Sequence, residues 1–179
     1  MDILTVNGIP YNAVKLLGHG KGGYSWLAER DGKEYGIKQI HHEPCSYYTF
    51  GNKIEAEWND YHKLTAAGIR LPQLLDIDWA QERILKEYIP GTTIFQLVKE
   101  DGVQPDYFHQ VRHMAWQAEQ KGLNIDYFPT NFVVQDGKMF YIDYECNGYM
   151  EQWNFESWGI GYWSQTAQFM QYAKDHGDL

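Results

Sequence analysis

Three polar residues late in the chain, Asp126, Asn131 and Asp143, have the types and spacing that chemistry on a phosphate requires. Asp126 and Asn131 lie five positions apart, and Asp143 follows the apolar run MFYI. Phosphoryl transfer needs oxygen ligands that hold Mg²⁺ against the phosphates, and a separate carboxylate that accepts or orients the proton of the acceptor hydroxyl. We therefore predict that Asp126 is the catalytic carboxylate and that Asn131 and Asp143 bind Mg²⁺.

A glycine-rich segment near the start of the chain, Gly18 to Gly23, reads G-x-G-x-x-G. Missing side chains let backbone amides approach a triphosphate, although an ordinary hairpin loop can have the same pattern. The segment continues into SWLAER, which is typical of a strand, whereas a dinucleotide-binding loop would continue into a helix. We predict that Gly18, Gly20 and Gly23 shape a phosphate-binding loop between two strands.

Lys38 ends the next predicted strand, Tyr35-Gly36-Ile37-Lys38, which resembles the kinase motif V-A-I-K, and this resemblance implies that Lys38 contacts the α- and β-phosphates. Such a lysine needs a carboxylate on a neighbouring helix to hold it in place. Both Glu55 and Glu57 lie in the helical pattern that follows. Glu57 is preferred because apolar residues four and seven positions later reproduce the spacing of a helix packed on a sheet, and Glu55 remains the alternative.

This ordered series resembles the protein kinase and aminoglycoside phosphotransferase superfamily, over roughly residues 10–146. The ending Asp143-Tyr144-Glu145 is closer to small-molecule phosphotransferases and atypical bacterial kinases than to D-F-G enzymes. The resemblance implies ATP and Mg²⁺ as cofactors and transfer of the γ-phosphoryl group to a hydroxyl. It also implies a hinge at residues 86–91, where backbone groups of Glu87 and Ile89 pair with the adenine edge.

The sequence departs from that family in ways that concern the acceptor. Asn124 and Ile125 stand where the family has the His and Arg of H-R-D, and no A-P-E segment follows Asp143. The acceptor site is therefore expected to be abbreviated or supplied by another chain, as in a homo-oligomer. The acceptor stays open between a Ser or Thr side chain of a protein and a small molecule. The alternative function is a nucleotide-binding pseudokinase with a regulatory or scaffolding role.

The elements that must position these residues follow from periodicity and turn signals. Short alternating segments separated by Asn7-Gly8 and Asp31-Gly32 predict antiparallel strands, and helical spacing begins at Lys53. Together with the resemblance, this pattern predicts an α+β, bilobal, protein-kinase-like fold. Residues 1–89 are predicted to form an antiparallel five-stranded N-lobe with one helix. Residues 90–179 form a truncated, mainly helical C-lobe.

In the predicted C-lobe, helices are expected at residues 92–99, 104–121 and 163–174. His109 and His113 are four positions apart on the second of these helices, and we interpret them as solvated residues because no third metal ligand accompanies them. The aromatic residues that follow position 150 are interpreted as core, with stacking on a sugar or base as the alternative.

Composition limits the classes of partner. The 179 residues are 44% hydrophobic and 22% charged, which is typical of a globular chain. The net charge of −9 argues against nucleic-acid binding, which depends on clustered Lys and Arg. No apolar run is long enough to predict a membrane span or a signal peptide. Cys45 and Cys146 form no CxxC pair, so reduced thiols and a cytoplasmic location are expected.

Overall fold

The computed structural model describes residues 2–44 and 52–176, in an α+β arrangement with antiparallel sheets and, within those ranges, four α-helices. The chain divides into two compact units. Unit 1 comprises Met1–Asn59 and Pro72–Tyr88, and unit 2 comprises Asp60–Leu71 and Ile89–Leu179.

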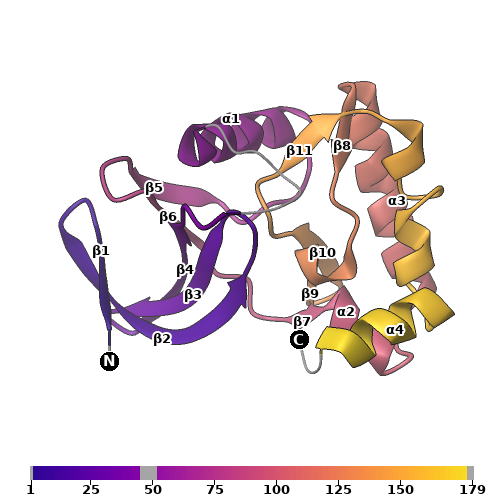
Figure 1. The fold of residues 1–179 in the computed structure, drawn as a ribbon, viewed down its shortest axis with the longest axis horizontal. Coiled ribbons are helices and arrows are strands. Elements are labelled where there is room, and N and C mark those ends of the chain that lie inside the picture. The colour runs from indigo at the N-terminus through magenta and orange to yellow at the C-terminus, as the bar shows by residue number, and fades with distance from the viewer. Residues whose placement is uncertain (1, 45–51, 177–179) are drawn as a thin grey trace. The chain divides into compact units, whose positions relative to one another are not determined.

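Unit 1 contains a curled antiparallel sheet of six strands in the order β1-β2-β3-β4-β6-β5 (Figure 1). The strands are β1 (Ile3–Val6), β2 (Ile9–His19), β3 (Gly23–Arg30), β4 (Lys33–Ile40), β5 (Leu74–Asp78) and β6 (Arg83–Glu87). The predicted count of five strands was wrong. Asn7 (φ 49°) and Gly8 (φ 82°) form a two-residue turn in the left-handed region, so β1 folds back and pairs with β2 as a separate edge strand.

The first helix, α1 (Lys53–Ala66), begins in unit 1 and ends within the range of unit 2. Its start is capped by Asn52, whose side-chain oxygen accepts the N–H of Glu55 at 3.1 Å. Ile54 is 3% exposed and Glu57 is also buried. The face of α1 that carries Glu57 is therefore a buried face.

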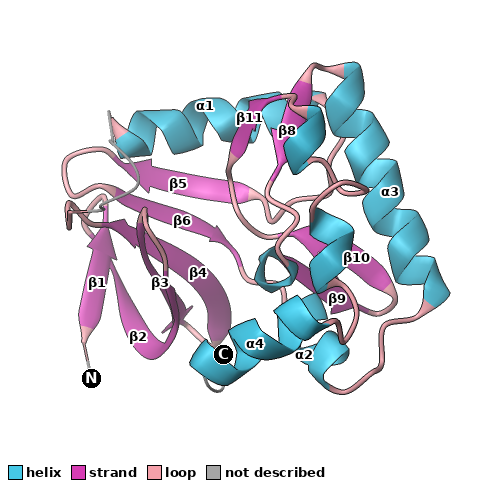
Figure 2. Ribbon diagram, turned by 45° about the vertical axis from the view of Figure 1, so that its right-hand side comes forward, coloured by secondary structure: helices cyan, strands magenta, loops and turns pink. Residues whose placement is uncertain are grey.

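Unit 2 is built from α2 (Ile94–Lys99), α3 (Pro105–Gln120), α4 (Ala167–His176) and five short strands. The strands are β7 (Thr92–Thr93), β8 (Leu123–Ile125), β9 (Phe132–Gln135), β10 (Lys138–Tyr141) and β11 (Cys146–Gly148), arranged as the sheets β10-β9-β7 and β11-β8 (Figure 2). The predicted helix over 92–99 begins two residues later than expected, because Thr92 and Thr93 pair with β9 and the Thr93 hydroxyl caps α2.

The core of unit 2 combines aliphatic residues with several large aromatic ones. Trp163 is fully buried, and its indole N–H donates to the carbonyl of Tyr127 at 2.8 Å. Phe155 is also buried, so both residues fill the core, whereas Trp153 is 49% exposed. Within residues 2–44 and 52–176, no helix combines the length and the apolar character needed to cross a bilayer.

Asp78, at the end of β5, joins two turns of unit 1. Its carboxylate accepts the N–H of Asn7 at 2.8 Å and the N–H of Gln81 at 3.0 Å. These hydrogen bonds hold the pKa of Asp78 below its usual value near 3.8. The ionised side chain therefore stabilises the folded state above about pH 4, and this contribution is lost as the pH falls through the lower pKa of the folded state.

We expect Asp78→Asn to lower the free energy of unfolding by about 2 kcal/mol at pH 7, because a charged acceptor of two backbone N–H groups is lost. Urea denaturation of both proteins between pH 7 and pH 3 should show this difference shrinking in acid. Asp31→Asn, in an exposed turn with φ 53°, is the control and should change stability by less than about 0.5 kcal/mol. A difference between wild type and Asp78→Asn that grows in acid would contradict the assignment.

Candidate functional site

In unit 1, Lys38 on β4 forms an ion pair with Glu57 on α1. Each side chain is 12% exposed, so both charges are largely withdrawn from water. Glu55, the alternative partner, is exposed. The ion pair holds the Lys38 ammonium beside the Glu57 carboxylate. Removing either partner would leave the other charge buried without it, which is costly.

The glycine-rich loop passes close to this ammonium. A Cβ added at Gly22 would lie 3.4 Å from Nζ of Lys38. The loop is closed by two backbone hydrogen bonds, from the N–H of Gly20 to the carbonyl of Gly23 (3.0 Å) and from the N–H of His41 to the carbonyl of Gly22 (3.2 Å). Backbone and ammonium thus lie together, which is the arrangement that binding of a phosphate requires.

The three predicted glycines differ in whether the fold itself requires glycine at their positions. A Cβ at Gly23 would lie 2.3 Å from the backbone oxygen of Gln39, so packing of β3 on β4 alone requires glycine there. At Gly18 and Gly20, no heavy atom in the described part of the chain lies within 4 Å of such a Cβ. The fold does not demand glycine at these two positions, and they leave open space in which a ligand can approach the backbone.

We expect Gly23→Ala to lower the unfolding free energy by about 2–3 kcal/mol, because the β3 and β4 backbones must separate. Gly18→Ala and Gly20→Ala should change stability by less than about 1 kcal/mol. If these two positions serve a nucleotide, the same two variants should weaken ATP binding. Chemical denaturation and an ATP titration of the three variants measure both properties. Equal destabilisation by all three would contradict this division of roles.

In unit 2, Asp126 directly follows β8 and organises the loop after it. Its Oδ1 accepts the N–H of Phe128 at 3.1 Å, and its backbone carbonyl accepts the side-chain N–H of Asn131 at 3.2 Å. The Asn131 amide nitrogen donates in this bond, and the carbonyl Oδ1 of the same amide is the atom that can bind a cation. The spacing of five residues therefore brings the Asn131 side chain to the backbone of Asp126 across one loop.

Asp143 follows β10, which pairs with β9. The N–H of Ile142 donates to the carbonyl of Asn131 at 2.9 Å. Asp143 therefore directly follows a residue that is hydrogen-bonded to Asn131. The negative charges of Asp143 and Asp126 both raise the pKa of Tyr141, beyond the larger effect of burial. The carboxylate of Asp143 and the amide oxygen of Asn131, from neighbouring segments, are hard oxygen ligands of the kind that Mg²⁺ prefers.

Tyr141 is a residue of this region that the sequence analysis did not single out. Its side chain is completely buried, its hydroxyl accepts the N–H of Asp126 at 3.1 Å, and it donates to the carbonyl of Glu145 at 2.8 Å. The phenol therefore joins the start of the Asp126 loop to the segment after Asp143. In the sequence it is one aromatic residue in the apolar run MFYI, and only its partners reveal its position.

We expect Tyr141→Phe to lower the unfolding free energy by about 1–3 kcal/mol, because the N–H of Asp126 and the carbonyl of Glu145 lose a buried partner. Any activity that depends on Asp126 should fall as well. Tyr107→Phe, at a partly exposed tyrosine of α3, is the matched control and should stay within about 0.5 kcal/mol. Thermal and urea unfolding of both variants check this expectation, and equal stability of the two would contradict it.

Asp60, on α1, ties the end of this segment to the helix. Its carboxylate accepts the N–H of Cys146 at 3.2 Å. Burial raises the pKa of Asp60, and the charge of Asp143 adds to the effect. Burial also raises the pKa of the Cys146 thiol to about 12, so this cysteine is a protonated core residue. Cys45 lies outside the described residues.

The residues predicted to contact adenine lie in different units. Glu87 ends β6, where its N–H donates to the carbonyl of Gln73 at 2.9 Å and its carboxylate accepts the N–H of Gln73 at 3.1 Å. With its N–H engaged, a contact of Glu87 with adenine must use its carbonyl oxygen. Ile89 belongs to unit 2 and is 7% exposed. Adenine binding by the two residues stays a prediction.

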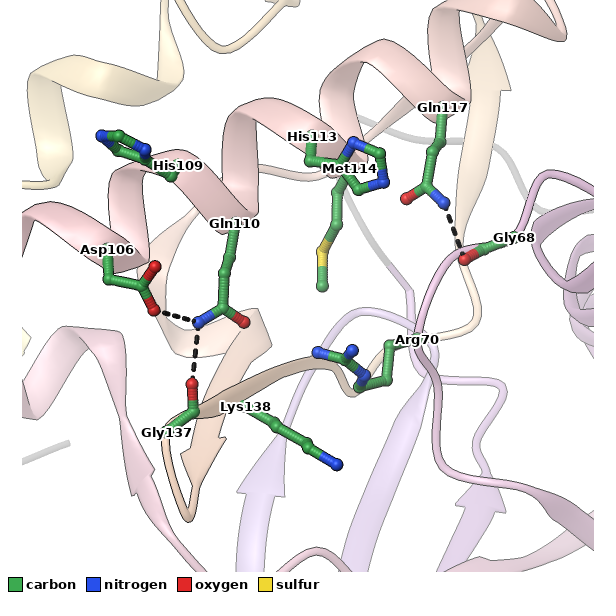
Figure 3. A pocket seen from close by; sticks show the side chains of 10 residues that line it. All are labelled: Gly68, Arg70, Asp106, His109, Gln110, His113, Met114, Gln117, Gly137 and Lys138. Carbon is green, nitrogen blue, oxygen red and sulfur yellow. Dashed lines mark hydrogen bonds between the residues drawn. The ribbon is translucent and has the colours of Figure 1, made fainter.

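A groove of about 470 Å³ lies on unit 2, beside α3 (Figure 3). It contains none of the predicted site residues, and its polar side chains connect elements of the unit. Gln110 donates to Asp106 and to the carbonyl of Gly137, both at 2.7 Å, and Gln117 donates to the carbonyl of Gly68 at 3.0 Å. His109 and His113 line the groove as exposed helix residues, in agreement with the sequence interpretation.

Comparison with known proteins does not place the chain in a family. No protein-family model matches it, and no curated protein matches it significantly.

Proposed function

We propose that the protein is an ATP- and Mg²⁺-dependent phosphotransferase with a hydroxyl acceptor, and a small member of the protein kinase and aminoglycoside phosphotransferase superfamily. On this proposal, unit 1 corresponds to most of the predicted N-lobe, and unit 2 corresponds to the predicted C-lobe together with Asp60–Leu71 and Ile89. The observation that carries the proposal is the buried ion pair of Lys38 and Glu57 beside the glycine-rich loop. A lysine held in this way is what the phosphates of ATP require of a phosphotransferase.

The proposed roles follow from the contacts of each residue. Lys38 binds the phosphates and Glu57 keeps its ammonium in place, while the backbone at Gly18 and Gly20 approaches the triphosphate. Asn131 and Asp143 would hold Mg²⁺, which shields the charge of the phosphates when it is bound. Asp126 accepts the proton of the acceptor hydroxyl. At the same time, the hydroxyl oxygen bonds to the γ-phosphorus and the bond between the γ-phosphorus and ADP breaks. Positioning and charge stabilisation account for most of the rate.

Two measurements test the proposal. Thermal unfolding with increasing ATP, with and without Mg²⁺, should show a nucleotide-dependent rise in Tm that Mg²⁺ increases. Incubation with γ-labelled ATP should then transfer label to a component of a lysate or metabolite mixture. An unchanged Tm at ATP concentrations far above any plausible Kd would refute nucleotide binding. A raised Tm without transfer of label to any acceptor would instead support the regulatory pseudokinase.

The same screen addresses the acceptor. Label that is precipitated with protein, and lost after treatment with a phosphoserine or phosphothreonine phosphatase, identifies a protein acceptor. Label in the soluble fraction identifies a small molecule. The proposal places either reaction in the cytoplasm, as expected from the sequence.

A further inference from the structure

A second set of chemically capable side chains lies in unit 1; it includes His19, within the glycine-rich segment, but the proposed reaction assigns these side chains no role. His19 is the last residue of β2, and His41 and Glu43 follow β4. One ligand atom from each of the three residues lies within 4.8 Å of the others. Nε2 of His19 is 3.4 Å from Oε1 of Glu43, and Nδ1 of His41 is 3.9 Å from Oε2 of Glu43.

The ring of His41 is prepared to act as a ligand through Nδ1. Its Nε2 lies 2.7 Å from the carbonyl oxygen of Gly20, and a carbonyl only accepts, so Nε2 carries the proton. The lone pair of Nδ1 accepts the N–H of Glu43 at 3.3 Å, so a metal ion bound at Nδ1 would replace this hydrogen bond. A carbonyl that binds the far nitrogen of a histidine is the usual support of a metal-binding imidazole, since it sets both tautomer and ring orientation.

Tyr24 supports the other two residues. The ring of His19 stacks on Tyr24 with centroids 4.3 Å apart, and the Tyr24 hydroxyl donates to the carboxylate of Glu43. This hydrogen bond raises the pKa of Tyr24 and lowers the pKa of Glu43, so it favours the carboxylate form of Glu43. The ring of His19 and the carboxylate of Glu43 are thus both oriented by Tyr24.

We propose that His19, His41 and Glu43 form a binding site for a divalent transition-metal ion, with Zn²⁺ as the probe. Two imidazoles and one carboxylate are a common ligand set for Zn²⁺ and leave a fourth position for water. In a tetrahedral site with bonds of about 2.1 Å, neighbouring ligand atoms lie about 3.4 Å apart. The distance from His19 to Glu43 already has this value, and the exposed side chains of these two residues can close on His41.

One neighbouring charge opposes the ion. Nζ of Lys53 lies 3.5 Å from Nδ1 of His41, and it donates to the carbonyls of Lys21 and His41. Repulsion between this ammonium and a cation lowers the affinity of the site, so a weaker site than a closed structural zinc centre is expected. A bound ion would link the end of β2, at the start of the glycine-rich segment, to the segment after β4. The site itself does not depend on the proposed phosphotransferase activity.

Calorimetric titration of the full chain with Zn²⁺, without nucleotide, tests the site. Wild type is expected to bind one ion, and His19→Ala and Glu43→Gln should each weaken binding by at least about tenfold. His42→Ala and His113→Ala are matched controls, since both histidines are exposed and neither belongs to the cluster, and they should bind as wild type does. His19 and Glu43 are themselves exposed, so circular dichroism should show these variants folded.

Absence of Zn²⁺ binding by wild type would overturn the proposal. Binding that survives both His19→Ala and Glu43→Gln would overturn it as well, because the ion would then lie elsewhere. A metal-dependent rise in Tm that is present in wild type and in His42→Ala, and lost in His19→Ala, would support it independently of calorimetry. ATP binding measured in parallel separates this result from the outcome for the phosphotransferase.

Discussion

Replacing Asp126 by Asn is expected to lower phosphoryl transfer by about 10²–10⁴-fold while ATP binding persists, because the carboxylate that accepts the acceptor proton is lost. The variant should fold, since the Asn side chain retains an oxygen that can accept the N–H of Phe128. Label transfer and ATP-dependent Tm shifts, measured on the same preparation, check the two halves of this expectation.

Asp136→Asn is the matched control for this experiment. Asp136 lies in the exposed turn between β9 and β10 with φ 50°, a conformation that Asn also adopts readily. Its substitution should leave both transfer and stability unchanged. If Asp126→Asn and Asp136→Asn transfer label as fast as wild type, Asp126 is not the catalytic carboxylate.

The second large effect is expected at the ion pair of Lys38 and Glu57. Lys38→Met and Glu57→Gln should each lower the unfolding free energy by about 3 kcal/mol, because each leaves the opposite charge buried without this partner. The double variant should lose less than the sum of the two, since no buried charge of the pair remains. Urea denaturation of the four proteins gives the coupling free energy directly.

Glu55→Gln distinguishes the two candidate carboxylates. Glu55 is exposed on α1, so its substitution should change stability by less than about 1 kcal/mol and should not couple to Lys38→Met. Under the proposed function, Lys38→Met and Glu57→Gln should also reduce label transfer, whereas Glu55→Gln should not. Coupling of Lys38 to Glu55 instead of Glu57 would contradict the structural assignment.

Local signals in the sequence determined much of the secondary structure. Asn-Gly and Asp-Gly turns mark hairpins because few other residues tolerate positive φ, and the structure has both pairs in that conformation at residues 7–8 and 31–32. The order and spacing of Lys38, Asp126, Asn131 and Asp143 were likewise visible without a structure. The predicted count of five strands was nevertheless wrong, because the sheet has a sixth strand: β1 pairs with β2 through the local Asn7-Gly8 turn.

Tertiary structure alone decided which residues support the chemistry. Helical spacing favoured Glu57 and kept Glu55 as an alternative, and the ion pair on the buried face of α1 identifies Glu57 as the partner of Lys38. The role of Gly23 follows from its approach to Gln39 on the next strand, and that of Tyr141 from hydrogen bonds to both sides of a loop. Residue types and spacing can indicate a type of reaction. Close contacts between distant segments form only when the chain packs, so no local sequence pattern encodes them.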